Sequence, residues 1–123
     1  MKGLKYLYDK KIIHRDLKLE NLLIHFTGLS SAGPVPWGSI DLEFEEFVVK
    51  IADFGFAKNM EPDGLADRKC GTPLVMAPEV IQNKPYSHKR DVWALGALYY
   101  QLVTGNYVFG HEYITIPDLE DNV

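Results

Sequence analysis

The stretch IIHRDLKLENLLI, residues 12–24, sets charged and amide side chains between two aliphatic flanks. Its polar members are His14, Arg15, Asp16, Lys18, Glu20 and Asn21. Because aliphatic flanks usually enter a core, we expect the polar residues between them to lie at the edge of that core. A carboxylate, an ammonium and an amide brought together there are suited to catalysis, although each one alone also fits an ordinary charged turn.

The composition limits the class of protein. The chain has 123 residues, of which 46% are hydrophobic and 24% charged, with a net charge of −4. These values fit one globular domain at most, and the lack of a basic stripe argues against a nucleic-acid surface. The longest apolar run, residues 92–100, is far shorter than the roughly 20 residues that a membrane span needs. A single cysteine, Cys70, allows no internal disulfide and favours an intracellular, cytoplasmic location.

Apolar spacing predicts the elements around the polar stretch. A helix is expected over residues 1–9, where leucine and tyrosine recur at helical spacing. Two short aliphatic runs, residues 22–24 and 48–52, predict the strands of a small hairpin. A proline opens an expected short helix over residues 78–82.

The longest expected helix, residues 90–103, is apolar on nearly every side. A helix of this kind has to be covered from all directions. Residues 106–123 hold too few apolar side chains to cover it. The chain is therefore expected to be a piece of a larger fold.

Residues 25–47 differ from the rest of the chain in charge and composition. They hold three glycines, two prolines, three serines and four acids, but no lysine or arginine. Outside this segment acidic and basic residues balance at 13 each, so the whole net charge lies within it. This composition indicates a solvated insertion. The alternation of residues 40–45 fits an edge strand, and the spacing of Phe44, Phe47 and Val48 fits a helical turn equally well.

Four short motifs occur in a fixed order: HRDLKLEN at 14–21, DFG at 53–55 after an expected strand, APE at 77–79 and DVWALG at 91–96. Together they resemble the eukaryotic protein kinases. Lys18, together with GTP at 71–73, is similar to the serine/threonine class. The stretches DFGFAK and GTPLVMAPEV are most similar to the autophagy-initiating, Unc-51-like kinases.

The resemblance implies an α+β fold, namely a fragment of the kinase C-terminal lobe that is mainly helical with a small two-stranded hairpin. Residues 1–123 would then run from the catalytic loop to the buried central helix of that large lobe, with the insertion at 25–47. The glycine-rich loop and the strand lysine that cover the nucleotide in this family do not occur in the sequence.

The resemblance also implies catalytic and binding roles. Asp16 would accept the proton of the substrate hydroxyl, and Lys18 would offset negative charge beside the γ-phosphate of ATP. Asn21 and Asp53 would hold Mg²⁺, a hard cation that prefers oxygen ligands. Leu23 would lie under the adenine ring. Each of these residues taken singly also fits a turn, cap or surface role.

Further residues are implied in structural roles. His14 would brace the DFG turn, and Thr72 would bridge Asp16 and Lys18 through its hydroxyl, unless it is simply a turn threonine. Glu79 pairs in this family with an arginine of a later helix, which the sequence does not contain, so its carboxylate is expected to lack that anchor. Asp91 stands near the start of the long helix.

Arg15 faces a phosphorylated residue in many kinases of this family. Residues 56–71 contain no serine, threonine or tyrosine, so phosphorylation there cannot create such a partner. One hypothesis is that Asp67, Asp63 or Glu61 acts as a permanent carboxylate partner. The alternative is a solvated acidic loop with Arg15 unpaired.

The leading interpretation is an incomplete, inactive fragment of a serine/threonine kinase. The activity of the parent would be transfer of the ATP γ-phosphate to protein hydroxyls, with Mg²⁺ as cofactor. Its partners would be ATP and a protein substrate, with neither nucleic acid nor membrane involved. Two alternatives remain: a non-catalytic kinase-like binding module, and an incomplete gene product.

Overall fold

The computed structural model describes residues 2–28, 38, 40–41, 43, 45–60, 65–66, 68–109 and 117. In chain order its helices and strands are α1 (Lys2–Asp9), β1 (Ile12–Ile13), β2 (Leu22–Phe26), β3 (Phe47–Ile51), β4 (Lys58–Asn59), α2 (Pro78–Ile81) and α3 (Lys89–Thr104). Short 3₁₀ turns precede β2 (Leu19–Asn21) and α2 (Pro73–Val75). None of the described helices is long and apolar enough to cross a membrane.

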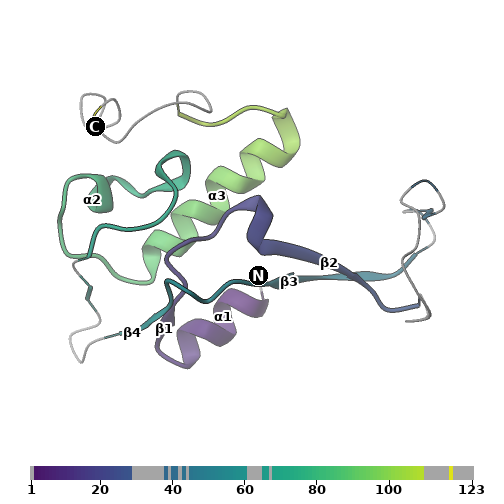
Figure 1. Cartoon of the computed structure of the whole chain (residues 1–123), viewed down its shortest axis with the longest axis horizontal. Helices are drawn as coiled ribbons and strands as arrows, with labels where there is room; N and C mark the ends of the chain where they lie inside the picture. Colours follow the sequence, from purple (N-terminus) through teal and green to yellow (C-terminus); the bar gives the residue numbers. More distant parts are fainter. Residues whose placement is uncertain are drawn as a thin grey trace.

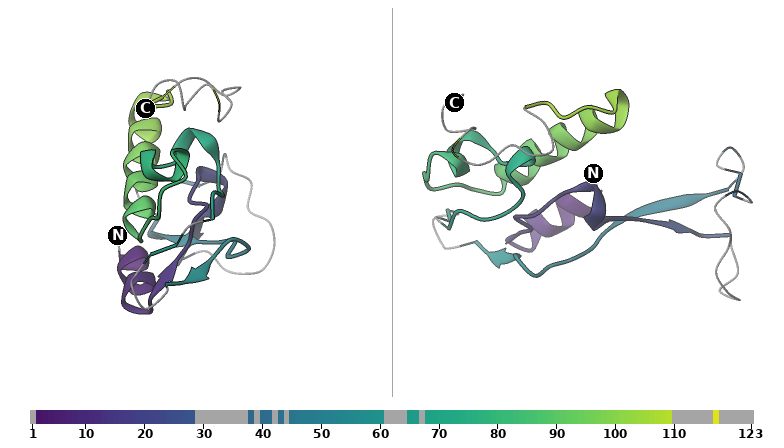
Figure 2. Two further views of the ribbon diagram at one scale, coloured as in Figure 1. Left: turned by 90° about the vertical axis from the view of Figure 1, so that its left-hand side faces the viewer. Right: turned by 45° about the horizontal axis from the view of Figure 1, so that its top comes forward.

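The predicted hairpin strands are confirmed. β2 and β3 pair antiparallel, with Leu22 opposite Ile51 and Phe26 opposite Phe47. Both strands extend into the ends of the segment that was expected to be an insertion, and they run side by side away from the helices (Figure 1, and the right-hand view of Figure 2). Phe47 and Val48 lie in β3, so the alternative of a helical turn is wrong at these two residues, whereas Phe44 lies outside the described residues. Before β3 the Glu45 amide donates to the Asp41 carbonyl at 2.9 Å.

A second antiparallel pair was not predicted. β1 and β4 face each other, with Ile12 opposite Asn59 and Ile13 opposite Lys58. Each strand is only two residues long, so neither shows the alternation that identifies a strand in a sequence. The expected helices are all present, with ends within two residues of the predicted ones.

Two apolar clusters form the core, and the polar stretch connects them. Ile13 belongs to a cluster with α2 and the residues around it, whose members are Ile13, Ala66, Met76, Ala77, Val80, Ile81 and Tyr86. Leu17 belongs to a second cluster, formed with α3 and the turn before α2, whose members are Leu17, Val75, Ala94, Ala97 and Leu98. Residues 14–16 therefore span two anchored side chains, which limits how far they can move.

One side of α3 is packed and another is open among the described residues. Ala94, Ala97 and Leu98 are buried, whereas Tyr99 and Leu102 keep 70% and 65% of their surface exposed. The described part of the chain therefore leaves one side of this apolar helix uncovered. Gly105 ends the helix in a left-handed conformation, with its amide bonded to the Gln101 carbonyl.

Replacing Leu17 by alanine tests the second cluster. Leu17 is almost fully buried, so Leu17→Ala is expected to lower the free energy of unfolding by about 2–5 kcal/mol through lost burial and a residual cavity. The matched control, Leu102→Ala, removes the same atoms from an exposed site and should cost less than about 0.5 kcal/mol. Urea unfolding followed by circular dichroism measures both. Equal losses for the two variants would show that this cluster does not form.

His88 gives the fold a pH dependence. Its ring lies 4.1 Å from that of Tyr8, and burial, followed by the charges of Lys89 and Lys11, lowers the pKa of His88 in spite of an opposing effect from Asp91. The unfolded chain then binds the proton more tightly, so stability is complete above about pH 6.5 and declines as the pH falls from there towards the lowered pKa.

The expected result is a wild-type unfolding free energy that falls on acidification through this window. The variant His88→Phe keeps a ring against Tyr8 but cannot titrate, so it should lack that component of the decline. Urea titrations over a series of pH values compare the two chains. An identical pH dependence in both would refute the assignment to His88.

Candidate active site

Asp91 anchors the backbone at the beginning of the polar stretch, residues 14–21. Its carboxylate lies in the first turn of α3, almost fully buried, and accepts the backbone amides of His14 at 2.7 Å and Arg15 at 3.0 Å. Hydrogen bonds to an ionised acceptor are stronger than those between neutral groups. Two such bonds on successive residues fix the direction in which the chain leaves Ile13, and therefore where Asp16 lies.

Two residues near the site adopt positive φ angles. Arg15 has φ 72° and Asp53 has φ 56°, values that only a few per cent of non-glycine residues show. The Asp91 bonds hold the first of these turns. In the second, the Asp53 Oδ1 accepts the Gly55 amide at 3.1 Å, a local bond that helps an aspartate to tolerate this conformation.

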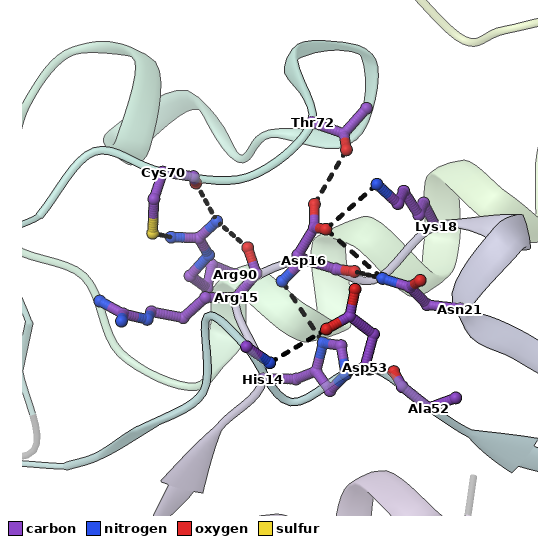
Figure 3. A network of polar contacts seen from close by, with 11 residues as sticks. His14, Arg15, Asp16, Lys18, Asn21, Ala52, Asp53, Cys70, Thr72 and Arg90 are labelled. Atoms are coloured by element: carbon purple, nitrogen blue, oxygen red, sulfur yellow. Dashed lines mark hydrogen bonds and ion pairs between the residues drawn. The ribbon is translucent and has the colours of Figure 1, made fainter.

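The Asp16 carboxylate is the centre of the site (Figure 3). It is 4% exposed. Its Oδ1 accepts the Thr72 hydroxyl at 2.8 Å, and its Oδ2 lies 3.3 Å from the Lys18 ammonium. The Asn21 amide nitrogen donates to the Asp16 carbonyl at 2.8 Å and lies 3.4 Å from Oδ2. Thr72 was expected to bridge Asp16 and Lys18. Among the described contacts its hydroxyl bonds to Asp16.

Asn21 and Asp53 present oxygens beside that carboxylate. Because the amide nitrogen of Asn21 is used on Asp16, its Oδ1 is left as the acceptor. Figure 3 shows the Asp53 carboxylate next to Asp16 and Asn21, although the residues are far apart in sequence. Among the described residues no three His, Cys, Asp or Glu side chains gather as a self-sufficient metal site. This donor set suits a hard cation that takes its remaining oxygens from a phosphate or water.

His14 connects the stretch to the segment that carries Asp53. Its Nε2 lies 3.0 Å from the Ala52 carbonyl, and the Asp16 amide donates weakly to Nδ1 at 3.4 Å, so the proton belongs on Nε2. The ring also meets Phe54 edge-on, at 5.0 Å between centroids. The Ala52 amide in turn donates to the Asn21 carbonyl at 2.8 Å. Asp53 is thus positioned by contacts on both sides of it.

Leu23 and Glu79 lie away from this group. Leu23 is in β2 with its side chain half exposed, and Glu79 is in the first turn of α2. Among the ion pairs between described residues, none includes Glu79. Neither position tests the role that the family resemblance implies for it.

Arg15 has partners, but none of them is a described carboxylate. Its side chain is buried, with Nε donating to the Phe56 carbonyl at 2.5 Å and Nη1 lying 3.5 Å from the Tyr86 hydroxyl. These contacts test neither the hypothesis of a carboxylate partner nor the alternative of an Arg15 without one. The three acids proposed as its partner, Asp67, Asp63 and Glu61, lie outside the described residues.

Arg90 and Tyr86 were missed by the sequence analysis. Both are buried, and the guanidinium of Arg90 lies 4.6 Å from the centre of the Tyr86 ring. A sign was present in the sequence, because Arg90 is a charged residue beside Asp91 at the start of an otherwise apolar helix. A charged pair at this position is equally typical of a solvated helix end.

One hollow of the described structure is apolar and is not lined by the polar group. It has a volume of about 500 Å³ and lies between α1, β3 and α3, with Leu4, Leu17, Leu22, Ile51 and Phe54 among its lining residues. Several of these are sequence neighbours of Asp16, Asn21 or Asp53. The carboxylates themselves remain outside it, so we place the candidate site on the polar group and not in the hollow.

Comparison with known proteins supplies the family. Residues 1–120 match the family described as protein kinase domain. The chain is 44% identical over 115 residues to the serine/threonine-protein kinase ATG1a of Arabidopsis thaliana, covering 93% of this chain and 16% of that protein. ATG1b of the same plant is 44% identical over 107 residues, covering 87% of this chain and 13% of the relative.

A relative from a distant organism gives the same result. The serine/threonine-protein kinase atg1 of Dictyostelium discoideum is 40% identical over 117 residues, covering 95% of this chain and 15% of that protein. The chain thus spans about a sixth or less of the length of these curated relatives. The predicted resemblance to serine/threonine kinases, and to the autophagy-type kinases in particular, is confirmed.

Removing the Asp91 carboxylate tests the anchor. Asp91→Ala leaves the amides of His14 and Arg15 buried without their acceptor and should lower the free energy of unfolding by about 2–4 kcal/mol. The control Asp9→Ala removes an exposed acid that pairs with Lys5 and should cost less than about 1 kcal/mol. Urea unfolding gives both numbers. A loss for Asp91→Ala no larger than the control's would contradict the anchoring role.

Proposed function

The chain belongs to the protein kinase domain family, and on that premise we propose that it is part of an enzyme that transfers the γ-phosphate of ATP to serine or threonine hydroxyls of proteins. The observation that carries the proposal is the Asp16 carboxylate, which is buried and oriented by Thr72, Lys18 and Asn21. A structural charge in a turn needs no such set of partners drawn from two distant segments.

Asp16 is the proton acceptor in this proposal. As the substrate hydroxyl oxygen bonds to the γ-phosphorus, the bond from that phosphorus to the β,γ-bridging oxygen of ATP breaks, ADP leaves, and the hydroxyl proton passes to the Asp16 carboxylate. The Thr72 and Lys18 contacts hold the two carboxylate oxygens in place, so the base does not have to reorganise during transfer. The Lys18 ammonium, part-exposed beside Asp16, is available to offset negative charge on the phosphoryl oxygens.

Asn21 and Asp53 are the residues that would hold Mg²⁺. The ion, when bound, neutralises charge on the phosphates and orients them. Asn21 contributes Oδ1 because its nitrogen is committed to Asp16, and Asp53 is fixed by the Gly55 amide and the His14–Ala52 contact. Leu23, on the exposed side of β2, is proposed to contact the adenine ring.

The serine/threonine specificity rests on Lys18 and Thr72, which converge on Asp16 from the catalytic loop and from the GTP stretch. We further propose that residues 1–123 form part of the large lobe, with an insertion at 25–47, and that the chain alone does not transfer phosphate. The exposed apolar side of α3, with Tyr99 and Leu102, supports a larger surrounding fold. The same surface would also suit a non-catalytic binding module, which the following experiment separates from an enzyme.

A chimera tests the proposal. Residues 1–120 replace the matching segment of the Arabidopsis ATG1a kinase, and transfer from radiolabelled ATP is measured on two peptides that differ only in carrying serine or tyrosine as acceptor. The chimera should label the serine peptide. Asp16→Asn, which removes the proton acceptor, and Asp53→Asn, which removes the negative charge of an ion ligand, should each lower kcat by about 10²–10⁴-fold.

Asp9→Asn is the matched control, because Asp9 is an exposed acid paired only with Lys5 among the described contacts. Its kcat should equal that of the unmodified chimera. A chimera that labels neither peptide, or one whose Asp16→Asn form keeps full activity, would contradict the proposed enzyme and favour the binding module.

A further inference from the structure

Arg90 connects the segment that carries Asp16 to the segment that carries Thr72, and the proposed reaction needs these two residues in contact. Its Nη2 donates to the Arg15 carbonyl at 2.7 Å and to the Cys70 carbonyl at 2.7 Å (Figure 3). The first carbonyl directly precedes Asp16, and the second lies two residues before Thr72. The buried Arg90 guanidinium therefore binds both chain segments that the hydrogen bond between Thr72 and Asp16 connects.

Tyr86 completes this attachment from the other side. Its ring lies under the Arg90 guanidinium, and its hydroxyl donates to the Arg68 carbonyl at 2.5 Å. Its backbone forms a reciprocal pair with Ala66, with both N–H to O distances at 2.7 Å. The segment that leads to Thr72 is thus tied to the beginning of α3 at successive points.

Gly71 shows how closely the two segments approach. It adopts φ +107°, and a Cβ at this position would lie 2.5 Å from the Arg15 carbonyl oxygen and 2.9 Å from Arg90 Nη2. Contacts that short do not occur with real side chains, so any larger residue would push the segment off the loop.

We propose that Arg90 is a positioning residue that replaces a phosphate switch: it locks the Thr72 segment onto the catalytic loop with a permanent cation. This inference rests on the proposed function. Residues 56–71 have no hydroxyl side chain that could carry a phosphate, and the side chain of Arg15 is turned to the Phe56 carbonyl and Tyr86. In the described residues before Thr72, Arg90 and Tyr86 hold the carbonyls of Cys70 and Arg68, so the attachment of this part to the catalytic loop needs no activating phosphorylation there.

The shape of the side chain matters as well as its charge. A guanidinium is planar, so it can stack on the Tyr86 ring while its edge donates to two carbonyls. A lysine at this position would keep the charge and part of the hydrogen bonding but lose the stacking. Arg90→Lys should therefore retain part of the function, and Arg90→Met, which keeps only apolar bulk, should retain almost none.

Amide hydrogen exchange on the full 123-residue chain tests the lock without requiring catalysis. In Arg90→Met, exchange in peptides covering residues 70–76 should be about tenfold faster, while peptides from β2 and β3 stay unchanged. Gly71→Ala should accelerate the same peptides even though Arg90 is retained. Lys89→Met is the control, because it removes a neighbouring exposed cation from the same helix and should leave the exchange of residues 70–76 unchanged.

The kinetic test uses the chimera with ATG1a. Arg90→Met should lower kcat at least tenfold with the KM for ATP within twofold, Arg90→Lys should recover part of the loss, and phosphatase treatment should leave the unmodified kcat unchanged. Unchanged exchange at residues 70–76 in Arg90→Met, acceleration that is uniform over the whole chain, or an unaltered kcat would each overturn the inference. An unmodified chimera without transfer would contradict the proposed function instead, and the exchange result would still decide the role of Arg90 as a lock.

Discussion

The pair of hydrogen bonds from the His14 and Arg15 amides to Asp91 is the constraint on which the rest of the site depends. These bonds join the polar stretch to the first turn of α3, the longest helix of the described structure. With Ile13 and Leu17 buried in separate clusters on either side, the backbone between them has little freedom. The positive φ at Arg15 is a strained turn that persists because these anchors determine it.

The buried polar side chains around that turn all have hydrogen-bond partners. The buried polar residues of the described structure are His14, Arg15, Asp16, Asn21, Arg90 and Asp91, and all belong to this one region. No buried side-chain nitrogen or oxygen in the described residues lacks a hydrogen-bond partner. Networks in which every member is satisfied are rigid, and partly satisfied ones are costly. The site is therefore a fixed scaffold, which suits a reaction in which the protein mainly positions groups.

The sequence predicted the elements and the polar candidates, but not the connections between them. Helical spacing and aliphatic runs identified α1, β2, β3 and α3, because periodicity over several residues reports burial directly. Asp16, Asn21 and Asp53 were named from motif order, and the structure brings them together. The role of Arg90 could not be predicted from the sequence, because its partners are the backbone carbonyls of Arg15 and Cys70, and every residue type has such a carbonyl. A contact to a backbone group therefore cannot be predicted from the identity of the residue that provides that group.

The most direct test of the account is a crystal structure of the kinase domain that carries this chain, grown with Mg²⁺ and a non-hydrolysable ATP analogue. We expect the Asn21 Oδ1 and an Asp53 carboxylate oxygen each to lie about 2.1 Å from one magnesium ion. The Asp16 carboxylate should lie beside the γ-phosphate without coordinating that ion. Electron density that places the ion and phosphates away from Asn21 and Asp53, or that shows Asp53 turned out of the site, would contradict it.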